Sequence, residues 1–404
     1  MERSAGVDWA KDEHAACVVD AGGQVVATRR VSHDEAGIVG LCHTLRELGV
    51  KRVALERPDG VLVERLLEAG LLVLAIHPNQ VRAARERYTV AGGKSDAFDA
   101  FVLAELARTD SHRFRVLAPD ADETKALRAL TRAREDLVAT RVALANQLRA
   151  ELERFWPGAL RLFAEIDSPI GLAFLERYPS PADARGLGLK RLAGFLERQG
   201  YSGKQDPAAM IERLRQAPRG TAGELEVEAR RGIVLAMVAA LRPLVAQITA
   251  LSGEITGAVR AHPDGHIFLS LFRGRRTSFT AARLVAEFGD CRARYPTEQA
   301  MAADAGMCPV AVESGKRRVA SFRRACDHRL RNAMTTLADT SRHTNPWARL
   351  IYERARAQGK AHPHAIRILG RAWVRVLWRM WQDGVAYDPA KHGGLQRLLL
   401  PGEG

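Results

Sequence analysis

Short apolar runs that end in a carboxylate constrain the first hundred residues more than any other feature of the chain. Asp8 and Glu56 each close a run typical of a buried strand, where a carboxylate is unfavourable unless it is paired or bound to a cation. Two further acids, Asp96 and Asp99, begin a helical pattern three residues apart and so share one face of the helix. Together the four acids predict an oxygen-rich site of the kind that holds two divalent ions about 4 Å apart for phosphodiester chemistry.

Strand and helix signals alternate over residues 1–110 and predict an α/β domain. Three strand signals come first, with a turn at Gly22-Gly23 between the second and the third. Helix and strand signals then alternate, and this order is that of the RNase H-like (RuvC-like) fold. A doubly wound nucleotide-binding domain is the alternative, but it requires a glycine-rich phosphate loop after the first strand, where Asp8-Trp9-Ala10-Lys11 offers none.

The length of 404 residues predicts two or three domains. We expect a RuvC-like nuclease domain over residues 1–120, long helices with a coiled-coil arm over residues 121–262, and a mostly α-helical domain over residues 263–404. Within the arm, residues 157–222 are rich in proline and glycine, which predicts short helices joined by turns.

Two stretches of the arm carry strong helical patterns. Leucines recur through residues 122–155 and predict one long helix that Pro157 ends. Apolar residues then repeat at spacings of three and four over residues 234–258, the seam pattern of helix-on-helix packing. This pattern fits a helix packed on its own domain, an intramolecular coiled coil or a dimer, and does not distinguish them. Pro243 lies inside the seam and is expected to bend the helix.

A surplus of basic residues points to a polyanionic partner. Lys and Arg number 61 against 47 Asp and Glu, which gives a net charge of +14. A surplus of this size favours nucleic acid, bound in a salt-dependent way, over acidic substrates or anionic lipid.

The remaining compositional signals concern the compartment. The five cysteines form no CxxC pair, so we expect reduced thiols rather than a zinc site or a disulfide framework. The first residues include Glu2 and Asp8 and lack the apolar core of a signal peptide, and no run reaches the roughly 18 apolar residues of a membrane span. The sequence therefore predicts a cytoplasmic, nucleoid-associated protein with no membrane partner.

A second candidate site is the basic stretch from Pro309 to Arg324, which is expected to be irregular. Ser314 precedes a glycine, whose small size permits the close approach of a phosphate. The surrounding basic side chains would hold phosphate oxygens and stabilise charge that develops on them. They are Lys316, Arg317, Arg318, Arg323 and Arg324. Spacing alone does not distinguish a nucleophilic Ser314 from a loop serine that contacts phosphate.

These motifs together resemble a known family. The first strand with Asp8, the strand ending in Glu56, and Lys94-Ser95-Asp96-Ala97-Phe98-Asp99-Ala100 are similar to the N-terminal DEDD domain of the IS110 family of bacterial insertion-sequence transposases. Ala305-Gly306-Met307-Cys308-Pro309, Glu313-Ser314-Gly315-Lys316 and residues 322–331 are similar to the family's second transposase domain. The likeness covers nearly the whole chain except residues 157–222.

The resemblance implies a chemistry and a set of partners. Asp8, Glu56, Asp96 and Asp99 would be ligands of a two-ion Mg²⁺ site, in which Mn²⁺ can substitute, and Ser314 would be the nucleophile that forms a covalent phosphoserine with DNA. The partners would be donor DNA, target DNA and an element-encoded bridge RNA that pairs with both. Members of the family act as homodimers that assemble into tetramers, with acids and serine drawn from different subunits.

Two other functions remain open from the sequence. In a RuvC-like or RNase H-like nuclease or junction resolvase, a metal-activated water would attack and Ser314 would be a loop residue. A non-catalytic nucleic-acid-binding relative would use neither site. Locally, Asp96 also fits a helix cap, and Asp8, Glu56 and Asp99 also fit ion pairs with the neighbouring Lys11, Arg57 or Lys94.

Overall fold

The computed structural model describes residues 2–88, 95–272, 278–314 and 317–399, so Lys94 and Lys316 lie outside the described residues. By contacts the chain divides into two compact units. Unit 1 comprises residues 1–122, 289–331 and 341–383, and unit 2 comprises residues 123–288, 332–340 and 384–404. The units interleave along the sequence because the C-terminal helices contribute to both.

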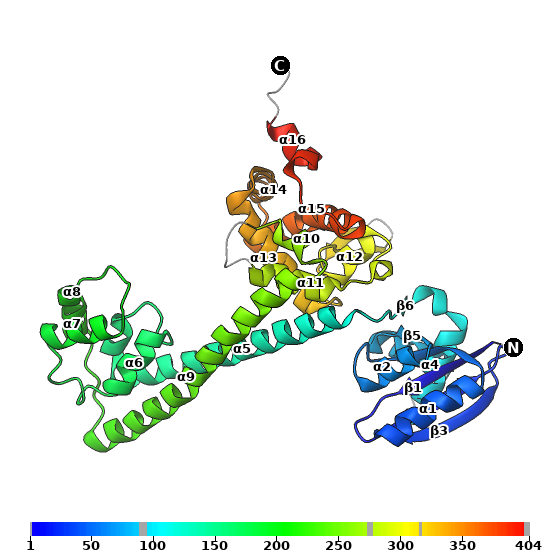
Figure 1. Cartoon of the computed structure of the whole chain (residues 1–404), viewed down its shortest axis with the longest axis horizontal. Helices are drawn as coiled ribbons and strands as arrows, with labels where there is room; N and C mark the ends of the chain where they lie inside the picture. The colour runs from blue at the N-terminus through cyan, green and yellow to red at the C-terminus, as the bar shows by residue number, and fades with distance from the viewer. Residues whose placement is uncertain (1, 89–94, 273–277, 315–316, 400–404) are drawn as a thin grey trace. The chain divides into compact units, whose positions relative to one another are not determined.

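A six-stranded mixed sheet with helices forms the N-terminal region (Figure 1). Its elements are β1 (Arg3–Asp8), β2 (Glu13–Val19), β3 (Val25–Ser32), α1 (Glu35–Glu47), β4 (Val50–Leu55), α2 (Val61–Glu68), β5 (Leu72–Ala75), α3 (Pro78–Tyr88), α4 (Asp96–Thr109), η1 (Ser111–Arg113) and β6 (Arg115–Val116). The strand order is β3-β2-β1-β4-β5-β6, in which β1, β4 and β5 run parallel and the other pairs antiparallel. The predicted α/β region with its leading antiparallel strands is confirmed, whereas α3 and β6 were not anticipated.

The sheet buries an apolar core on each face. Val7, Val53 and Leu55 pack with α1 and α2 on one face, and Ala54 and Leu74 pack with α4 on the other. The contact between α4 and β1 is close because residue 6 is glycine. A Cβ at that position would lie 2.2 Å from the carbonyl oxygen of Ala100, so only glycine lets the helix backbone come this near.

Two long helices run through unit 2 (Figure 1). They are α5 (Asp122–Phe155) and α9 (Glu224–Ala261), and the predicted bounds of α5 are confirmed. Thr124 hydrogen-bonds His262 at 2.8 Å, Arg134 donates to Ser252 at 2.7 Å, and Arg230 pairs with Glu151. Along these three contacts the residue number rises on α5 and falls on α9, so the two helices run antiparallel. Pro243 lies inside the continuous helix α9.

The predicted seam of α9 is buried at alternate positions. Val234, Leu241, Ile248 and Ile255 are at most 5% exposed, while the other seam positions are half-buried. These are Met237, Leu244, Leu251 and Ala258. Residues 157–222 form η2 (Pro157–Arg161), α6 (Pro169–Arg177), α7 (Leu189–Arg198) and α8 (Pro207–Gln216). These short helices, which the sequence predicts, share a core with the facing ends of α5 and α9.

Helix α9 corrects one expectation. Among the described residues it is long and apolar enough to cross a membrane by length and composition, since an 18-residue window has a mean hydropathy of 1.9. The expectation that no stretch reaches this limit is therefore wrong. A packed helix of a protein without a membrane segment passes the same test, and α9 packs on α6, α10 and α11 within unit 2.

The C-terminal elements are helical apart from one hairpin. They are α10 (Gly265–Leu269), α11 (Ser278–Phe288), η4 (Arg292–Arg294), α12 (Glu298–Asp304), β7 (Val310–Ser314), β8 (Arg317–Ser321), α13 (His328–Thr344), α14 (Pro346–Ala357), α15 (His362–Asp383), η5 (Pro389–Lys391) and α16 (Gly393–Leu399). The stretch from Pro309 to Arg324, expected to be irregular, instead holds an antiparallel β-hairpin. The strand signal in this stretch is the valine pair Val310 and Val312 at a spacing of two, which the basic residues obscured.

Candidate active site and nucleic-acid interface

The register of the sheet places Asp8 and Glu56 at equivalent positions along the neighbouring strands β1 and β4. Gly6 of β1 is paired with Ala54 of the parallel strand β4. Asp8 and Glu56 each follow two residues later, so both lie at the carboxyl ends of neighbouring strands and on the same face as Gly6 and Ala54. That face is the one covered by α4, and both side chains are partly buried there.

Asp99 lies in the first turn of α4 and is 2% exposed. Arg85 of α3 hydrogen-bonds both of its carboxylate oxygens: Nη2 donates to Oδ2 at 2.7 Å, and Nε donates to Oδ1. The same Nη2 lies 3.9 Å from Oε1 of Glu56. One guanidinium thus serves two of the predicted acids, which shows that Asp99 and Glu56 lie close together.

Asp96 is the first residue of α4 and is exposed. The helix cap is Ser95, whose Oγ accepts a hydrogen bond from the Phe98 amide at 3.2 Å. Asp96 therefore does not cap the helix, and three residues before Asp99 it lies on the same side of α4.

Asp99 takes its counter-ion from a residue distant in the sequence rather than from a sequence neighbour. Arg57 pairs with Asp59 at 3.5 Å and stacks on Trp9, while Asp99 pairs with Arg85, which is 14 residues away in the sequence. Burial explains this choice, because Asp99 needs a partner that can enter the space between α3 and α4.

The donor chemistry fits a hard divalent cation, since the predicted ligands are carboxylates. Across residues 2–88, 95–272, 278–314 and 317–399, however, no three His, Cys, Asp or Glu side chains are grouped so that they could hold a metal ion. Both oxygens of the Asp99 carboxylate are engaged by Arg85. The guanidinium of Arg85 therefore supplies positive charge to Asp99 and lies within 3.9 Å of Glu56.

A stack of side chains ties together the chain segments that follow β1 and β4. The guanidinium carbon of Arg57, next to Glu56, lies 4.2 Å from the ring centroid of Trp9, next to Asp8. Trp9 also contacts the rings of His14 and His33, each with centroids 6.2 Å away. His14 is fully buried, and burial together with the charge of His33 lowers the pKa of His14.

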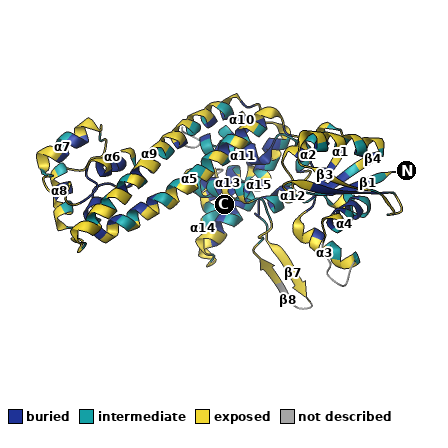
Figure 2. Ribbon diagram, turned by 90° about the horizontal axis from the view of Figure 1, so that it is seen from below, coloured by how far each residue is buried: buried dark blue, intermediate teal, exposed yellow. Residues whose placement is uncertain are grey.

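Ser314 is the last residue of β7 and is exposed. Figure 2 shows the hairpin of β7 and β8 in the exposed colour over its described side chains. Ser314 pairs with Arg317, and Val312 with Val319. Because alternate residues share a face, Ser314 lies on the same face of the hairpin as Val310 and Val312.

The predicted phosphate contacts gather around this hairpin. Arg317 and Arg318 belong to β8, although their side chains lie outside the described structure, as does all of Lys316. Arg323 follows the hairpin and its Nε donates to the Cys308 carbonyl at 3.3 Å. Arg324 is exposed, and its backbone carbonyl accepts from His328 at 3.3 Å.

Two family models match the chain. Residues 5–157 match the DEDD transposase model of IS110 elements. Residues 277–353 match a model described as a transposase of the IS116/IS110/IS902 family.

Relatives match over nearly their full length. The chain is 34% identical over 395 residues to the mini-circle putative transposase for IS117 of Streptomyces coelicolor, covering 95% of this chain and 94% of the relative. It is 31% identical over 391 residues to the 44.8 kDa protein of insertion element IS116 of Streptomyces clavuligerus, covering 95% and 96%. It is 30% identical over 393 residues to the 42 kDa protein of insertion element IS900 of Mycobacterium paratuberculosis, covering 96% and 97%.

These matches and the sheet with its row of acids define an insertion-sequence transposase. The chain belongs to the IS116/IS110/IS902 family of transposases. Its substrates are therefore DNA, and the DEDD type of its N-terminal region suggests the use of a divalent metal ion.

Sequence reasoning missed Arg85, Trp9 and Arg57 as parts of the acid site. A buried Asp99 on a helix calls for a cation, but the sequence offers several arginines in α3 and gives no periodicity that singles out one of them. Trp9 and Arg57 had a clearer signal, because each directly follows a candidate ligand in a neighbouring strand.

Proposed function

We propose that this chain is an RNA-guided DNA recombinase that moves an insertion sequence by cutting and rejoining strands through a covalent phosphoserine. Its N-terminal region is RuvC-like in this proposal. The observation that carries the proposal is the shared level of Asp8 and Glu56 on the face of α4 where Asp99 is buried. Three carboxylates directed to one edge of a sheet have a high electrostatic energy that a bound cation lowers.

Asp8, Glu56, Asp99 and Asp96 would hold Mg²⁺ in a two-ion site, with Mn²⁺ as a substitute. When bound, such ions neutralise charge on the phosphate and polarise it for attack. Packed elements would set the positions of two of these ligands, because Glu56 follows β4 in the sheet and Asp99 is buried in the first turn of α4. Asp96, on the exposed side of the same helix turn, completes it toward solvent.

Ser314 acts as the nucleophile in this mechanism. Its hydroxyl loses a proton, its Oγ forms a bond to phosphorus, and the bond from phosphorus to one deoxyribose oxygen breaks as that oxygen takes up a proton. The new ester retains the energy of the phosphodiester, so the reverse step joins a different strand without a nucleotide cofactor. The exposed end of β7 supports this role, because an attacking hydroxyl must be accessible to a phosphate.

The partners in this proposal are donor DNA, target DNA and an element-encoded bridge RNA that selects both by base pairing. The net charge of +14 supports contacts to nucleic-acid backbones. Assembly would proceed from homodimers to tetramers in the cytoplasm. The apolar window of α9, of which only 22% is buried, leaves surface for helix pairing between copies in addition to the packing on α5.

Substitution of Ser314 tests the covalent step. The variant Ser314→Ala should bind DNA normally but give neither strand joining nor a detergent-stable protein–DNA adduct. Ser321→Ala is the matched control, because Ser321 is exposed on the opposite strand of the same hairpin. Full activity of Ser314→Ala without an adduct would instead indicate attack by water, as in a nuclease or junction resolvase.

RNA guidance and the need for catalysis are tested separately. Transposition should require the element's non-coding RNA, and changing a loop of that RNA should redirect the insertion site. If removing the RNA leaves insertion unchanged, guidance is wrong. Unaltered transposition by Asp8→Ala would favour a non-catalytic, nucleic-acid-binding role.

A further inference from the structure

An aromatic ring directly after the hairpin is in contact with two guanidinium groups. Phe322 follows β8 and is 47% exposed, although it is a large apolar residue. The guanidinium carbon of Arg331, in the first turn of α13, lies 4.6 Å from the ring centroid, and that of Arg367, in α15, lies 4.8 Å from it. Three separate segments of unit 1 thus converge at one ring.

Neither arginine forms an ion pair with a carboxylate among the residues that the structure describes. Arg331 donates from Nη2 to the backbone carbonyl of Arg323, and its buried Nε has no hydrogen-bond partner among the described atoms. Burial and the charge of Arg331 lower the pKa of Arg367. Two cations held at one ring without an anion repel each other, and a bound anion would remove that penalty.

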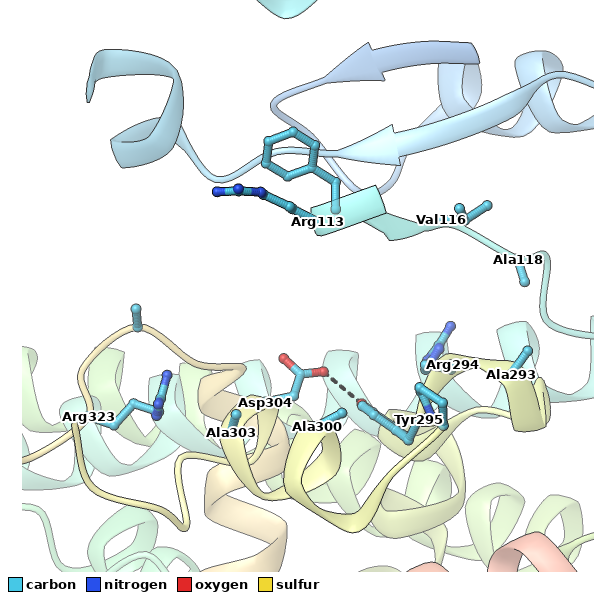
Figure 3. Close-up of a pocket in the computed structure, with 13 residues that line it drawn as sticks. Arg113, Val116, Ala118, Ala293, Arg294, Tyr295, Ala300, Ala303, Asp304 and Arg323 are labelled. Carbon is cyan, nitrogen blue, oxygen red and sulfur yellow. Dashed lines mark hydrogen bonds between the residues drawn. The ribbon is translucent and has the colours of Figure 1, made fainter. Parts of the chain in front are cut away.

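The two carboxylates near Arg331 in the sequence or in the fold form hydrogen bonds with other residues. Asp327 caps α13 by accepting from the amides of Arg329 and Leu330 at 2.9 and 3.0 Å. Asp304 accepts a hydrogen bond from the Tyr295 hydroxyl at 2.7 Å (Figure 3). These contacts direct both carboxylates to neighbours of their own.

The local backbone makes room for Arg331. Gly306 has a φ of +63°, and a Cβ there would lie 2.6 Å from Nε of Arg331. A larger residue at this position would push the side chain away from the ring. The site is therefore built by the backbone at the end of α12, as well as by the side chains.

We propose that Phe322, Arg331 and Arg367 form a binding site for a phosphate of a nucleic-acid backbone, at the base of the hairpin that presents Ser314. The planar fork of a guanidinium matches phosphate oxygens, and the ring holds both guanidinium groups in place. Arg367 would offer its fork, and Arg331 would offer Nη1, because its Nη2 donates to the Arg323 carbonyl and its Nε is buried. The site extends the predicted contacts of Arg323 and Arg324 to residues of α13 and α15. It rests on the proposed function in one respect, since the bound strand is the one that Ser314 attacks.

The salt dependence of binding tests this site. For the full chain and a DNA duplex, the slope of log K against log salt concentration should fall in magnitude by about 0.9 in Arg331→Gln and again in Arg367→Gln, because each removes one phosphate contact. Affinity near physiological salt should drop by roughly tenfold for each. Thermal unfolding of each variant establishes that it is folded.

Two controls sharpen the result. Arg375→Gln should leave the slope unchanged, because that guanidinium already pairs with Glu298 at 3.0 Å. Arg367→Lys keeps the charge but not the fork, so it should keep the slope while weakening affinity. An unchanged slope in folded Arg331→Gln and Arg367→Gln would overturn the inference.

The outcome is independent of the nucleophile. If Ser314→Ala still forms an adduct while the salt dependence of binding becomes weaker in the two arginine variants, the phosphate site stands and the serine mechanism fails. If Ser314→Ala loses the adduct and the slopes are unchanged, the mechanism stands and the phosphate site fails.

Discussion

The acids lie at the edge of a sheet that is covered on both faces, whereas Ser314 lies at the end of a two-stranded hairpin with exposed side chains. Asp8 and Glu56 are held by strand register, and Asp99 by the close packing of α4 on Gly6. Nothing comparable holds Ser314 among the described residues, since the second sheet consists of β7 and β8 alone.

This difference separates two ways of placing a reactive group. A two-stranded hairpin by itself is marginally stable in water, so we expect the position of Ser314 to depend on what the hairpin binds. The acids are fixed by folding, before any substrate arrives. If Ser314 is the nucleophile, as proposed above, this arrangement would act as a safeguard, because the hydroxyl would reach its working position only with nucleic acid in place.

The largest expected effect comes from Asp99→Asn, which keeps the shape of the side chain and removes its charge. Strand cleavage should fall by more than about 100-fold, since even groups that only support metal ligands are worth 10- to 100-fold in affinity. Gel assays of cleavage with Mg²⁺ and with Mn²⁺ measure the loss. Asp96→Asn, in the same helix turn but exposed, should lose less. Equal activity of Asp99→Asn and the unmodified chain would remove the acid site from the mechanism.

A smaller and opposite effect is expected from Arg85→Gln. Because the Arg85 guanidinium occupies both oxygens of Asp99, its removal should raise the affinity for Mn²⁺ by about tenfold, as expected for the loss of one competing charge-assisted interaction. Electron paramagnetic resonance titration of the full chain reads the free ion directly. Arg82→Gln, an exposed arginine on the same helix, is the control. Unchanged or weaker Mn²⁺ binding would show that Arg85 does not compete with the ion.

The N-terminal fold was predictable from the sequence because its signals are local. Alternating apolar runs gave the strands, Gly22-Gly23 gave the hairpin turn, and the structure confirms the leading antiparallel strands. The leucine repeat likewise gave α5 with its observed bounds. The hairpin at residues 310–321 was missed, because its basic residues outweighed an alternation of only a few apolar positions.

The contacts within the site were less predictable than the fold. Strand order brings Asp8 and Glu56 together, and that much follows from two neighbouring parallel strands. The partner of Asp99 does not, because Arg85 reaches it only through the packing of α3 beside α4. The convergence of Arg331 and Arg367 on Phe322 likewise depends on helix packing that no local pattern encodes.

A double-mutant cycle on Trp9 and Arg57 examines how rigidly folding holds the acids. Each single variant, Trp9→Leu and Arg57→Gln, removes the stack that joins the ends of β1 and β4. The coupling free energy of unfolding should be about 0.5–1 kcal/mol, and cleavage should fall only a few-fold. Urea denaturation of the two single variants and the double variant gives the coupling. Additive effects would mean that the stack does not fix the strand ends.

The last expected effect is on stability and comes from pH acting through His14. The amide of Ala10 donates to Nδ1 of His14 at 3.3 Å, so Nε2 carries the proton and donates to His33 at 2.8 Å. A second proton on Nδ1 would oppose the Ala10 amide, in keeping with the lowered pKa of His14 that burial and His33 produce. The stabilisation is therefore fully present above the unfolded pKa of 6.5 and is lost as the pH falls through the folded value. The free energy of unfolding should decline between pH 7.5 and pH 5.5, by at most about 1.4 kcal/mol per pH unit from this one group. In His14→Gln, urea denaturation should show a shallower decline of the free energy of unfolding over the same pH range. If both chains lose stability equally, another group is responsible and the histidine pair does not link pH to the sheet.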